Sequence, residues 1–167
     1  KLLGSAVADA KGEWIYTPSV ALAEGEHAFT ITATDAAGNK TASAAQYKIY
    51  IDFVPPAAPT IDSVHDDVGA VQGELQNGAS TDDTQPTFKG KAEANSTVII
   101  RDRGTEIGRA AVDENGDWSF TPASSLNTGV HSSNVVAMDK AGNISAPSNT
   151  FDFSLVTTPG MAPSITS

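Results

Sequence analysis

Apolar and polar side chains alternate along several short segments of the chain, and this alternation predicts β-strands. In residues 27–34 (HAFTITAT) the apolar side chains of Phe29, Ile31 and Ala33 would share one face of a strand. Residues 47–53 (YKIYIDF) repeat the pattern, which predicts that Tyr47, Ile49, Ile51 and Phe53 point inward. The later copy keeps this inward set as Phe151, Phe153 and Leu155. No segment shows the apolar period of about 3.6 residues that marks an amphipathic helix. The pattern therefore predicts an all-β protein.

Turn-forming residues divide the later part of the chain into about seven strands. Gly, Asn, Asp and Pro interrupt runs rich in Thr, Val and Ile, and hairpin signals lie at residues 102–104, 114–116 and 140–143. The predicted strands fall near residues 59–64, 86–92, 96–101, 106–112, 117–121, 131–138 and 147–155. Seven short strands at this spacing predict an Ig-like β-sandwich with Greek-key connections.

Four aromatic residues occur at matching places in this pattern. Trp14 and Tyr16 alternate on one predicted strand, and Trp118 and Phe120 alternate on another. Exposed tryptophans can form platforms on which sugars stack. A tryptophan that shares an inward face with a second aromatic residue favours core packing instead, which contributes about 2–3 kcal/mol per side chain.

The chain repeats itself at a constant spacing. Residues 4–63 align with residues 108–167 without a gap, at an offset of 104 positions, and about 20 of the 60 pairs are identical. Shared strings include GEWIYTP with GDWSFTP, EGEH with TGVH, and TDAAGN with MDKAGN. A period of this size equals one small sandwich, so the chain is predicted to be part of a tandem array.

The register of the repeat predicts the domain boundaries. Residues 1–54 correspond to the C-terminal half of one repeat, residues 55–156 to a complete repeat, and residues 157–167 to a linker and the start of a further one. Prolines in residues 54–59 (VPPAAP) favour a stiff, extended linker. Half a sandwich cannot cover its own apolar face, so the sequence is predicted to be a fragment of a much longer protein. The first segment would then either borrow partner strands from another molecule or come from a unit whose beginning is missing here.

Composition narrows the possible partners. The formal net charge is −10 and cysteine is absent. Nucleic acids and anionic membrane surfaces bind basic patches, so neither is an expected partner. No run approaches the roughly 18 apolar residues of a membrane span, so direct membrane insertion is not expected.

No set of residues in the sequence suggests catalysis. The chain has no cysteine, no GxSxG string and no matched Ser/His/Asp set, so it is not expected to be an enzyme. His27 and His131 occupy equivalent repeat positions on the apolar face of a strand, which favours a structural role.

One acidic segment contains the main candidate metal ligands. Residues 65–85 (HDDVGAVQGELQNGASTDDTQ) form a long predicted loop with an aspartate pair near each end: Asp66, Asp67, Asp82 and Asp83. Ca²⁺ takes about six to eight oxygen ligands, and four carboxylates this close would repel one another without a cation. We therefore predict a Ca²⁺ site here. The alternative is a solvated loop in which each aspartate caps a turn.

Two equivalent hairpins contain further aspartates, Asp35 and Asp139, each at the start of a DxAGN string. The favoured role is structural, with the carboxylate accepting backbone amides of the turn. The alternative is that they complete a Ca²⁺ site at a junction between repeats. Counting strands up and down places the DxAGN loop at the end where its domain begins and the acidic segment at the opposite end.

These strings together resemble a known family. DDVG, NG and TDD in the acidic segment, followed by GxWxFTP, GxH and DxAGN, resemble the bacterial Ig-like repeats of giant surface adhesins. The resemblance covers residues 57–156 and, in half, residues 1–54. It implies tandem Ig-like sandwiches, export by type I secretion, display at the bacterial cell surface, and Ca²⁺ held by aspartates that stiffen the rod. Met138 and Lys140 depart from Thr34 and Ala36 of the first copy, so a metal site is less expected at the second DxAGN loop than at the first.

The function expected from this resemblance is structural. The chain would be a stalk segment of a large secreted adhesin, rigidified by Ca²⁺ and supporting cell adhesion or biofilm formation. Its expected partners are neighbouring Ig-like repeats, with a host glycan or receptor as a candidate partner of other parts of the protein. The alternative is an Ig-like module that grips a carbohydrate or a host protein directly through its loops.

Overall fold

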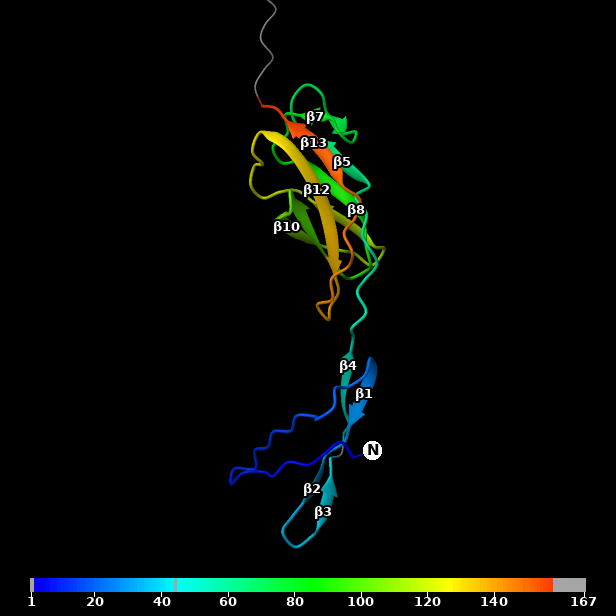
Figure 1. Ribbon diagram of the computed structural model, residues 1–167, viewed down its shortest axis with the longest axis vertical. Helices are drawn as coiled ribbons and strands as arrows, with labels where there is room; N and C mark the ends of the chain where they lie inside the picture. Colours follow the sequence, from blue (N-terminus) through cyan, green and yellow to red (C-terminus); the bar gives the residue numbers. More distant parts are fainter. Residues whose placement is uncertain (1, 44, 158–167) are drawn as a thin grey trace, which may run out of the picture. The chain divides into compact units, whose positions relative to one another are not determined.

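The computed structural model describes residues 2–43 and 45–157, and all regular elements among them are β-strands. The chain forms two compact units, called unit 1 (residues 1–53) and unit 2 (residues 54–167), shown in Figure 1. The described residues form no helix that could cross a membrane. Most of the further repeat predicted at 157–167 lies outside the described residues. The all-β prediction is confirmed.

Nine strands lie within the described part of unit 2. They are β5 (Ser63–Asp66), β6 (Gly73–Glu74), β7 (Ser80–Thr81), β8 (Thr87–Lys91), β9 (Thr97–Asp102), β10 (Thr105–Ala111), β11 (Asp117–Phe120), β12 (Gly129–Met138) and β13 (Phe151–Leu155).

These strands form two sheets that enclose one core. The first sheet has the order β10-β9-β12-β13-β7 and the second has the order β11-β8-β5-β6. Inward side chains of both sheets pack together, as alternation predicts. The buried cluster consists of Ile61, Val64, Phe88, Val98, Ile100, Val112, Trp118, Val135, Phe151 and Phe153. Unit 2 is therefore a β-sandwich of the predicted class.

One strand pair in this sandwich is parallel, whereas the other neighbours pair antiparallel. Ser80 of β7 lies opposite Ser154 of β13, and Thr81 lies opposite Leu155. The amides of Ser154 and Val156 donate to Ala79 and Thr81 at 2.9 Å and 2.8 Å. β7 therefore forms one edge of its sheet and holds the last strand of unit 2.

The acidic segment is more regular than predicted. β6 pairs with β5 and β7 pairs with β13 inside a stretch expected to be a loop. Each of these strands has two residues, which is too short for apolar alternation to be visible in the sequence. The first strand also begins later than the predicted 59–64, although the amides of Thr60 and Asp62 already donate to carbonyl oxygens of Lys91 and Lys89 at 2.8 Å.

Unit 1 forms only part of such a sandwich. Its described strands are β1 (Gly25–Phe29), β2 (Thr32–Thr34), β3 (Lys40–Ala42) and β4 (Tyr47–Ile51). β1 pairs with β4 and β2 pairs with β3. The strand predicted to be continuous over residues 27–34 is thus divided. Its counterpart β12 is continuous because β9 lies beside it.

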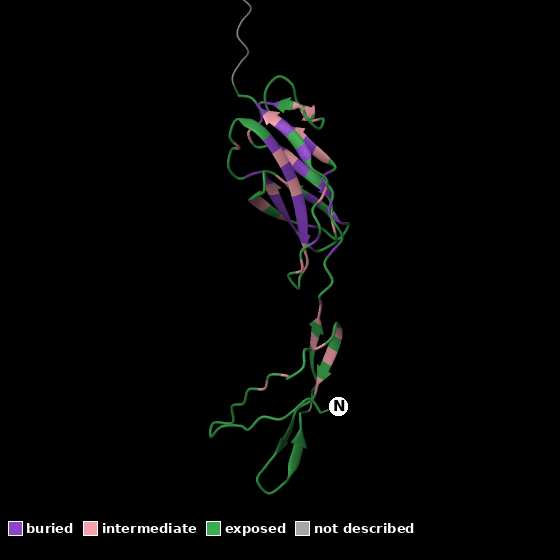
Figure 2. Ribbon diagram, viewed as in Figure 1, coloured by how far each residue is buried: buried purple, intermediate pink, exposed green. Residues whose placement is uncertain are grey.

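The aromatic residues of unit 1 are exposed because unit 1 lacks the neighbouring strands that cover their counterparts in unit 2. The predicted strand with Trp14 and Tyr16 does not form, whereas Trp118 and Phe120 lie in β11, which pairs with β8. The exposed fraction of Trp14 is 48% and that of Trp118 is 3%. Figure 2 shows buried residues in unit 2 and mostly exposed ones in unit 1. Apolar positions of unit 1 such as Tyr47 and Phe53 are therefore exposed, contrary to the inward placement predicted for them.

Candidate functional site

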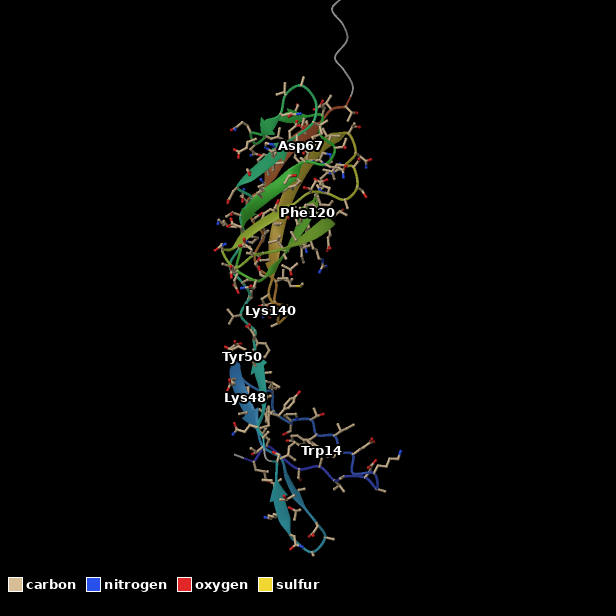
Figure 3. All side chains as sticks on the ribbon, turned by 180° about the vertical axis from the view of Figure 1, so that it is seen from behind. Trp14, Lys48, Tyr50, Asp67, Phe120 and Lys140 are labelled. Carbon is tan, nitrogen blue, oxygen red and sulfur yellow. The ribbon has the colours of Figure 1, made fainter. Side chains whose placement is uncertain are left out.

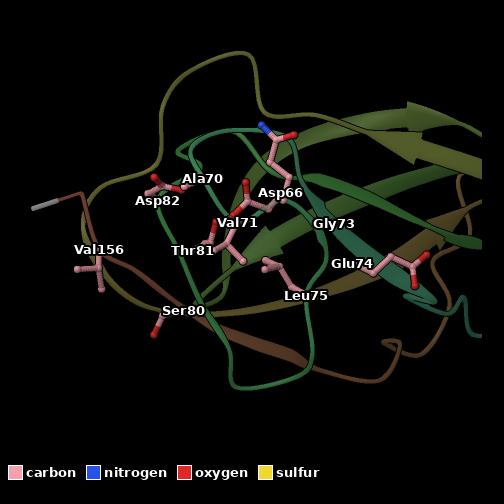
Figure 4. Close-up of a pocket in the computed structure, with 11 residues that line it drawn as sticks. Asp66, Ala70, Val71, Gly73, Glu74, Leu75, Ser80, Thr81, Asp82 and Val156 are labelled. Atoms are coloured by element: carbon pink, nitrogen blue, oxygen red, sulfur yellow. Dashed lines mark hydrogen bonds between the residues drawn. The ribbon is translucent and has the colours of Figure 1, made fainter. Parts of the chain in front are cut away.

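The acidic segment lies at the end of unit 2 from which the chain leaves (Figure 1). There, Asp66, Thr81 and Asp82 line an open pocket of about 280 Å³ together with Val156, the residue that follows β13 (Figure 4). The DxAGN loop at residues 139–143 lies at the opposite end of unit 2. The side-chain amide of Asn143 there donates to the carbonyl oxygen of Val54 at 3.5 Å. Strand counting predicts this placement of the two loops.

Asp66 lies at the end of β5 and is buried, with an exposed fraction of 2%. The Thr81 hydroxyl donates to Asp66 Oδ2 at 2.6 Å, and the Val68 amide donates to Oδ1 at 2.9 Å. Both carboxylate oxygens thus accept a hydrogen bond, one from β7 and one from the following turn. Asp66 therefore ties β5 to β7.

Asp83 has a similar role on the other side of Thr81. Its exposed fraction is also 2%, and its Oδ1 accepts the amide of Gln85 at 2.8 Å. Its own amide donates to the Thr81 hydroxyl at 3.0 Å, while the Asp67 amide lies 3.4 Å from its Oδ2. Asp66, Thr81 and Asp83 therefore form one buried network that joins the two ends of the acidic segment.

Asp67 and Asp82 are exposed, unlike their sequence neighbours. Successive residues of an extended chain point to opposite sides, so each aspartate pair places one carboxylate inside and one outside. The Asp82 carboxylate lies against Gly69, whose φ is +72°, and a Cβ at that position would collide with it. A glycine is thus required for Asp82 to approach the turn after β5.

These four aspartates do not converge on one point in the structure. Among residues 2–43 and 45–157, no group of three or more His, Cys, Asp or Glu side chains is arranged to hold a metal ion. The donor chemistry of the segment suits Ca²⁺, but the positions of its carboxylates do not supply a site. A Ca²⁺ site in the acidic segment stays a prediction.

The two DxAGN loops have one geometry. In each loop the amide of the asparagine donates to aspartate Oδ1 at 2.8 Å, and its side-chain amide donates to Oδ2 at 2.8 Å. These bonds join Asp35 to Asn39 and Asp139 to Asn143. Both oxygens of each carboxylate therefore stabilise the turn, which is the structural role favoured from the sequence. A part in a junction Ca²⁺ site stays a prediction for both residues.

The hydrogen bonds in these loops lower the pKa values of both aspartates. For Asp35, the side-chain amide of Asn39 is the largest cause and its backbone amide the next. For Asp139, desolvation is the largest contribution and raises the pKa, but the side-chain and backbone amides of Asn143 together with the turn amides outweigh it. Both carboxylates are thus held in the charged form.

We expect Asn39→Ala to raise the pKa of Asp35 and to leave that of Asp139 unchanged. Each lowered pKa stabilises the folded loop at pH values above the unfolded pKa, and this contribution is lost as the pH falls below about 4 through the folded pKa. The measurement is an NMR titration of the aspartate side chains, in which Asp139 serves as the internal control. Equal titration of Asp35 in both proteins would contradict the assignment.

A buried pair that sequence reasoning missed lies near the acidic segment. His131 Nδ1 lies 2.8 Å from Asp102 Oδ2, its Nε2 lies 2.8 Å from the carbonyl oxygen of Asn127, and its ring stacks on Phe153 at 4.9 Å. Both members of the pair are buried. The equivalent repeat positions of His27 and His131 indicate a structural role, but Asp102 belongs to the hairpin signal at residues 102–104. The sequence therefore does not identify Asp102 as the partner of His131.

Comparison with known proteins places the chain in a family. The sequence model of the bacterial Ig-like domain family matches residues 1–53 and 57–156. No curated protein sequence matches the chain.

Several solved structures are similar to the chain. The fibronectin(III)-like modules of CbhA from Clostridium thermocellum share 16% identity at a TM-score of 0.35, over 48% of this chain and 90% of that one. CopC from Methylosinus trichosporium OB3b shares 13% identity at a TM-score of 0.33, over 48% of this chain and 84% of that one. The BSP domain of a biofilm associated protein shares 17% identity at a TM-score of 0.36, over 82% of this chain and 26% of that one.

The family match covers all of unit 1 and the whole described sandwich of unit 2. The two units share the geometry of the DxAGN loop, and β1 pairs with β4 in the same register as β12 with β13. Both similarities agree with the family match. The chain belongs to the bacterial Ig-like domain family.

Proposed function

We propose that this chain is a load-bearing, non-enzymatic segment of a bacterial surface protein. In this proposal, Ig-like units follow one another in a stalk that supports cell adhesion or biofilm formation outside the cell. Membership of the bacterial Ig-like family and the internal repeat support a structural role. The burial of Trp118 in the core of unit 2 favours this function over direct sugar binding by that side chain.

The strand arrangement of unit 2 is suited to bear tension, and this arrangement is the main support for the proposal. The chain enters before β5 and leaves after β13 at opposite ends of unit 2 (Figure 1), so a pull on the chain draws these two strands in opposite directions. β13 is held by β7 in a parallel pair. A pull along β13 therefore shears its hydrogen bonds to β7 together, whereas a hairpin would open them one at a time.

The buried network of the acidic segment connects the load-bearing strand pair to the first strand of unit 2. Thr81 of β7 donates to Asp66 of β5, so the last strand is joined through β7 to the first strand. The backbone amide of Asp83 donates a hydrogen bond to the hydroxyl of the same threonine. Asp66 and Asp83 thus have a mechanical role in the proposal that does not depend on a metal ion.

We expect Val156→Pro to weaken unit 2 under load. The Val156 amide donates to Thr81 at 2.8 Å and its side chain is exposed, so proline removes one sheared hydrogen bond with little loss of packing. Proline also favours an extended residue before it, which Leu155 already is. A bond worth about 1 kcal/mol corresponds to about fivefold faster unfolding at constant force, measured by single-molecule force spectroscopy on the full chain.

Val156→Ala is the matched control, because it shortens the side chain and keeps the amide. It should unfold at the wild-type rate under the same force. If Val156→Pro and Val156→Ala unfold at the same rate, the β7–β13 pair does not bear the load and the proposal fails.

Ca²⁺ binding by the acidic segment is the second part of the proposal. Asp66 and Asp83 are buried, and none of the ion pairs among the described residues includes either of them. The exposed side chains of Asp67 and Asp82 can turn on a fast timescale and bring further carboxylate oxygens to this end of unit 2. Bound Ca²⁺ would neutralise the segment and fix it beside the last strand.

We expect Ca²⁺ to raise the melting temperature of unit 2. At free Ca²⁺ about ten times the dissociation constant, linkage adds about 1.4 kcal/mol, which corresponds to about 5 °C or more for a domain of this size. Calorimetry with Ca²⁺ and with chelator measures the effect. The double variant Asp67→Asn, Asp82→Asn keeps the buried network and should lose the increase. The same melting temperature of the wild type in Ca²⁺ and in chelator would remove Ca²⁺ from the proposal.

A further inference from the structure

The sequence contains three Asn-x-Ser/Thr tripeptides, the acceptor motif for N-linked glycosylation. They are Asn39-Lys40-Thr41, Asn95-Ser96-Thr97 and Asn143-Ile144-Ser145, and none has proline at its middle position. The motif is short and recurs by chance, so the sequence does not tell which of them can accept a sugar. In the structure they differ in the hydrogen-bond partners of the asparagine amide.

Two of these tripeptides begin in the DxAGN loops, where the asparagine amide is already bound. Asn39 Nδ2 donates to Asp35 Oδ2 and Asn143 Nδ2 donates to Asp139 Oδ2, each at 2.8 Å. Lys140, labelled in Figure 3, belongs to the second of these loops. Each nitrogen must leave its carboxylate before it can enter the active site of a transferase, so both loops resist modification.

Asn95 is different, because its side chain has no part in the structure of its turn. It lies between β8 and β9 with a φ of +63°, in the left-handed region that asparagine tolerates. Its backbone amide donates to the carbonyl oxygen of Asp113 at 3.3 Å, and the Ser96 hydroxyl donates to that of Glu93 at 2.6 Å. The side chain of Asn95 is exposed and has no hydrogen-bond partner among the described residues. The turn thus keeps its shape and leaves the Asn95 side-chain amide free.

The hydroxyl two positions later is free in this tripeptide as well. The motif requires that hydroxyl in addition to the asparagine. Thr97 is half-buried at the start of β9, and its hydroxyl has no hydrogen-bond partner in the described part of the chain. Ser145 is buried; its hydroxyl accepts the Ala137 amide at 2.8 Å and donates to the carbonyl oxygen of Ala146 at 2.7 Å. The tripeptide that starts at Asn95 therefore offers both groups of the motif.

We propose that Asn95 is an acceptor site for N-linked glycosylation, modified by a transferase that uses a diphosphate-activated sugar. Nδ2 of Asn95 forms a bond to the anomeric carbon of the sugar, and the bond between that carbon and the diphosphate oxygen breaks. The diphosphate leaves with the electron pair, and Nδ2 gives up one proton to a base of the transferase. The product is a neutral secondary amide on an exposed turn, which adds hydrophilic bulk outside the core of unit 2. This site is separate from load bearing and from Ca²⁺ binding.

The test exposes the unmodified full chain to two bacterial transferases that recognise Asn-x-Ser/Thr. One is an oligosaccharyltransferase with a lipid-diphosphate-linked oligosaccharide, and the other is an N-glucosyltransferase with UDP-glucose. Peptide mapping by mass spectrometry measures the occupancy of each asparagine. Synthetic peptides of each tripeptide with its flanking residues, in which no fold protects the amide, give the intrinsic preference of each enzyme. The enzyme that modifies Asn95 shows whether the sugar comes from a lipid carrier or from a nucleotide.

Relative to these peptides, Asn95 in the folded chain should be modified at least about tenfold faster than Asn39 or Asn143. The reason is that a hydrogen bond to a charged carboxylate must break at the other two positions. Thr97→Val removes the hydroxyl, keeps the shape of the side chain and suits a strand, so it should abolish modification of Asn95. Thr97→Ser keeps the hydroxyl and is the matched control, which should retain the modification.

The glycosylation site is refuted if Asn95 stays unmodified with both sugar donors. It is also refuted if, after correction for the peptides, Asn39 and Asn143 are modified as fast as Asn95, since the free amide would then not select the site. Modification of Thr97→Val at the wild-type rate would show that Asn95 reacts as an ordinary exposed amide and not as the acceptor of this motif.

Discussion

Trp118→Ala is expected to lower the free energy of unfolding of unit 2 by about 3–5 kcal/mol. Trp118 is 3% exposed and packs in the core between the two sheets, so truncation leaves a cavity as well as losing buried area. Trp14 occupies the equivalent repeat position but is 48% exposed. Trp14→Ala should therefore leave the denaturant midpoint of unit 2 unchanged. Chemical denaturation of both variants measures the difference.

Trp118→Phe sharpens this comparison. The indole N–H of Trp118 is buried and has no hydrogen-bond partner among the described residues. Phenylalanine fills part of the space and removes the unsatisfied donor, so its cost should be clearly below that of alanine. Equal losses for Trp118→Phe and Trp118→Ala would show that filling this space contributes little to the core.

Asp102→Ala is expected to cost about 3 kcal/mol or more in unit 2. It removes the acceptor of His131 Nδ1 at 2.8 Å, of the Ser132 amide at 3.0 Å and of Arg103 Nε at 3.3 Å. His131 is buried, so its ring nitrogen would lose its partner where water has little access. Thermal and chemical denaturation both report the loss.

Asp117→Ala provides the control for this variant. Asp117 also pairs with a basic side chain, Lys91 at 2.6 Å, but both partners are more than half exposed. Ion pairs in water contribute little, so this variant should unfold close to the wild-type midpoint. Equal losses for Asp102→Ala and Asp117→Ala would show that the buried pair stabilises unit 2 no more than an exposed one does.

The sandwich itself could be predicted from the sequence because its long strands carry the signal. The alternation in the last predicted strand gave Phe151, Phe153 and Leu155 as inward positions, and all three are buried. β6 and β7 could not be predicted in this way, because two residues cannot show a period. Their position depends on pairing with β5 and β13, which lie far away in the sequence.

The acidic segment shows a second limit of sequence reasoning. Four aspartates close together in sequence favoured one shared site, but adjacent residues of an extended chain face opposite ways. Asp66 and Asp83 are consequently buried, and Asp67 and Asp82 are exposed. Their partners, Thr81 and the amides of the following turns, could not be inferred from charge alone.

The split of residues 27–34 in unit 1 has a related cause. The equivalent residues 131–138 (HSSNVVAM) of unit 2 alternate less regularly and yet lie in one continuous strand. Strand propensity depends on the neighbours that a strand packs against, and only unit 2 provides the neighbour on the β9 side. A sequence pattern can thus be correct for a complete repeat and wrong for half of one.

The DxAGN turns take the same shape whether or not a full sandwich surrounds them. Their bonds span four residues, so they can close early in folding, before distant segments meet. Neighbouring repeats of related sequence are prone to exchange strands while they fold. A turn that closes on itself commits the strands on either side of it to each other, and so reduces the chance that nascent repeats become entangled.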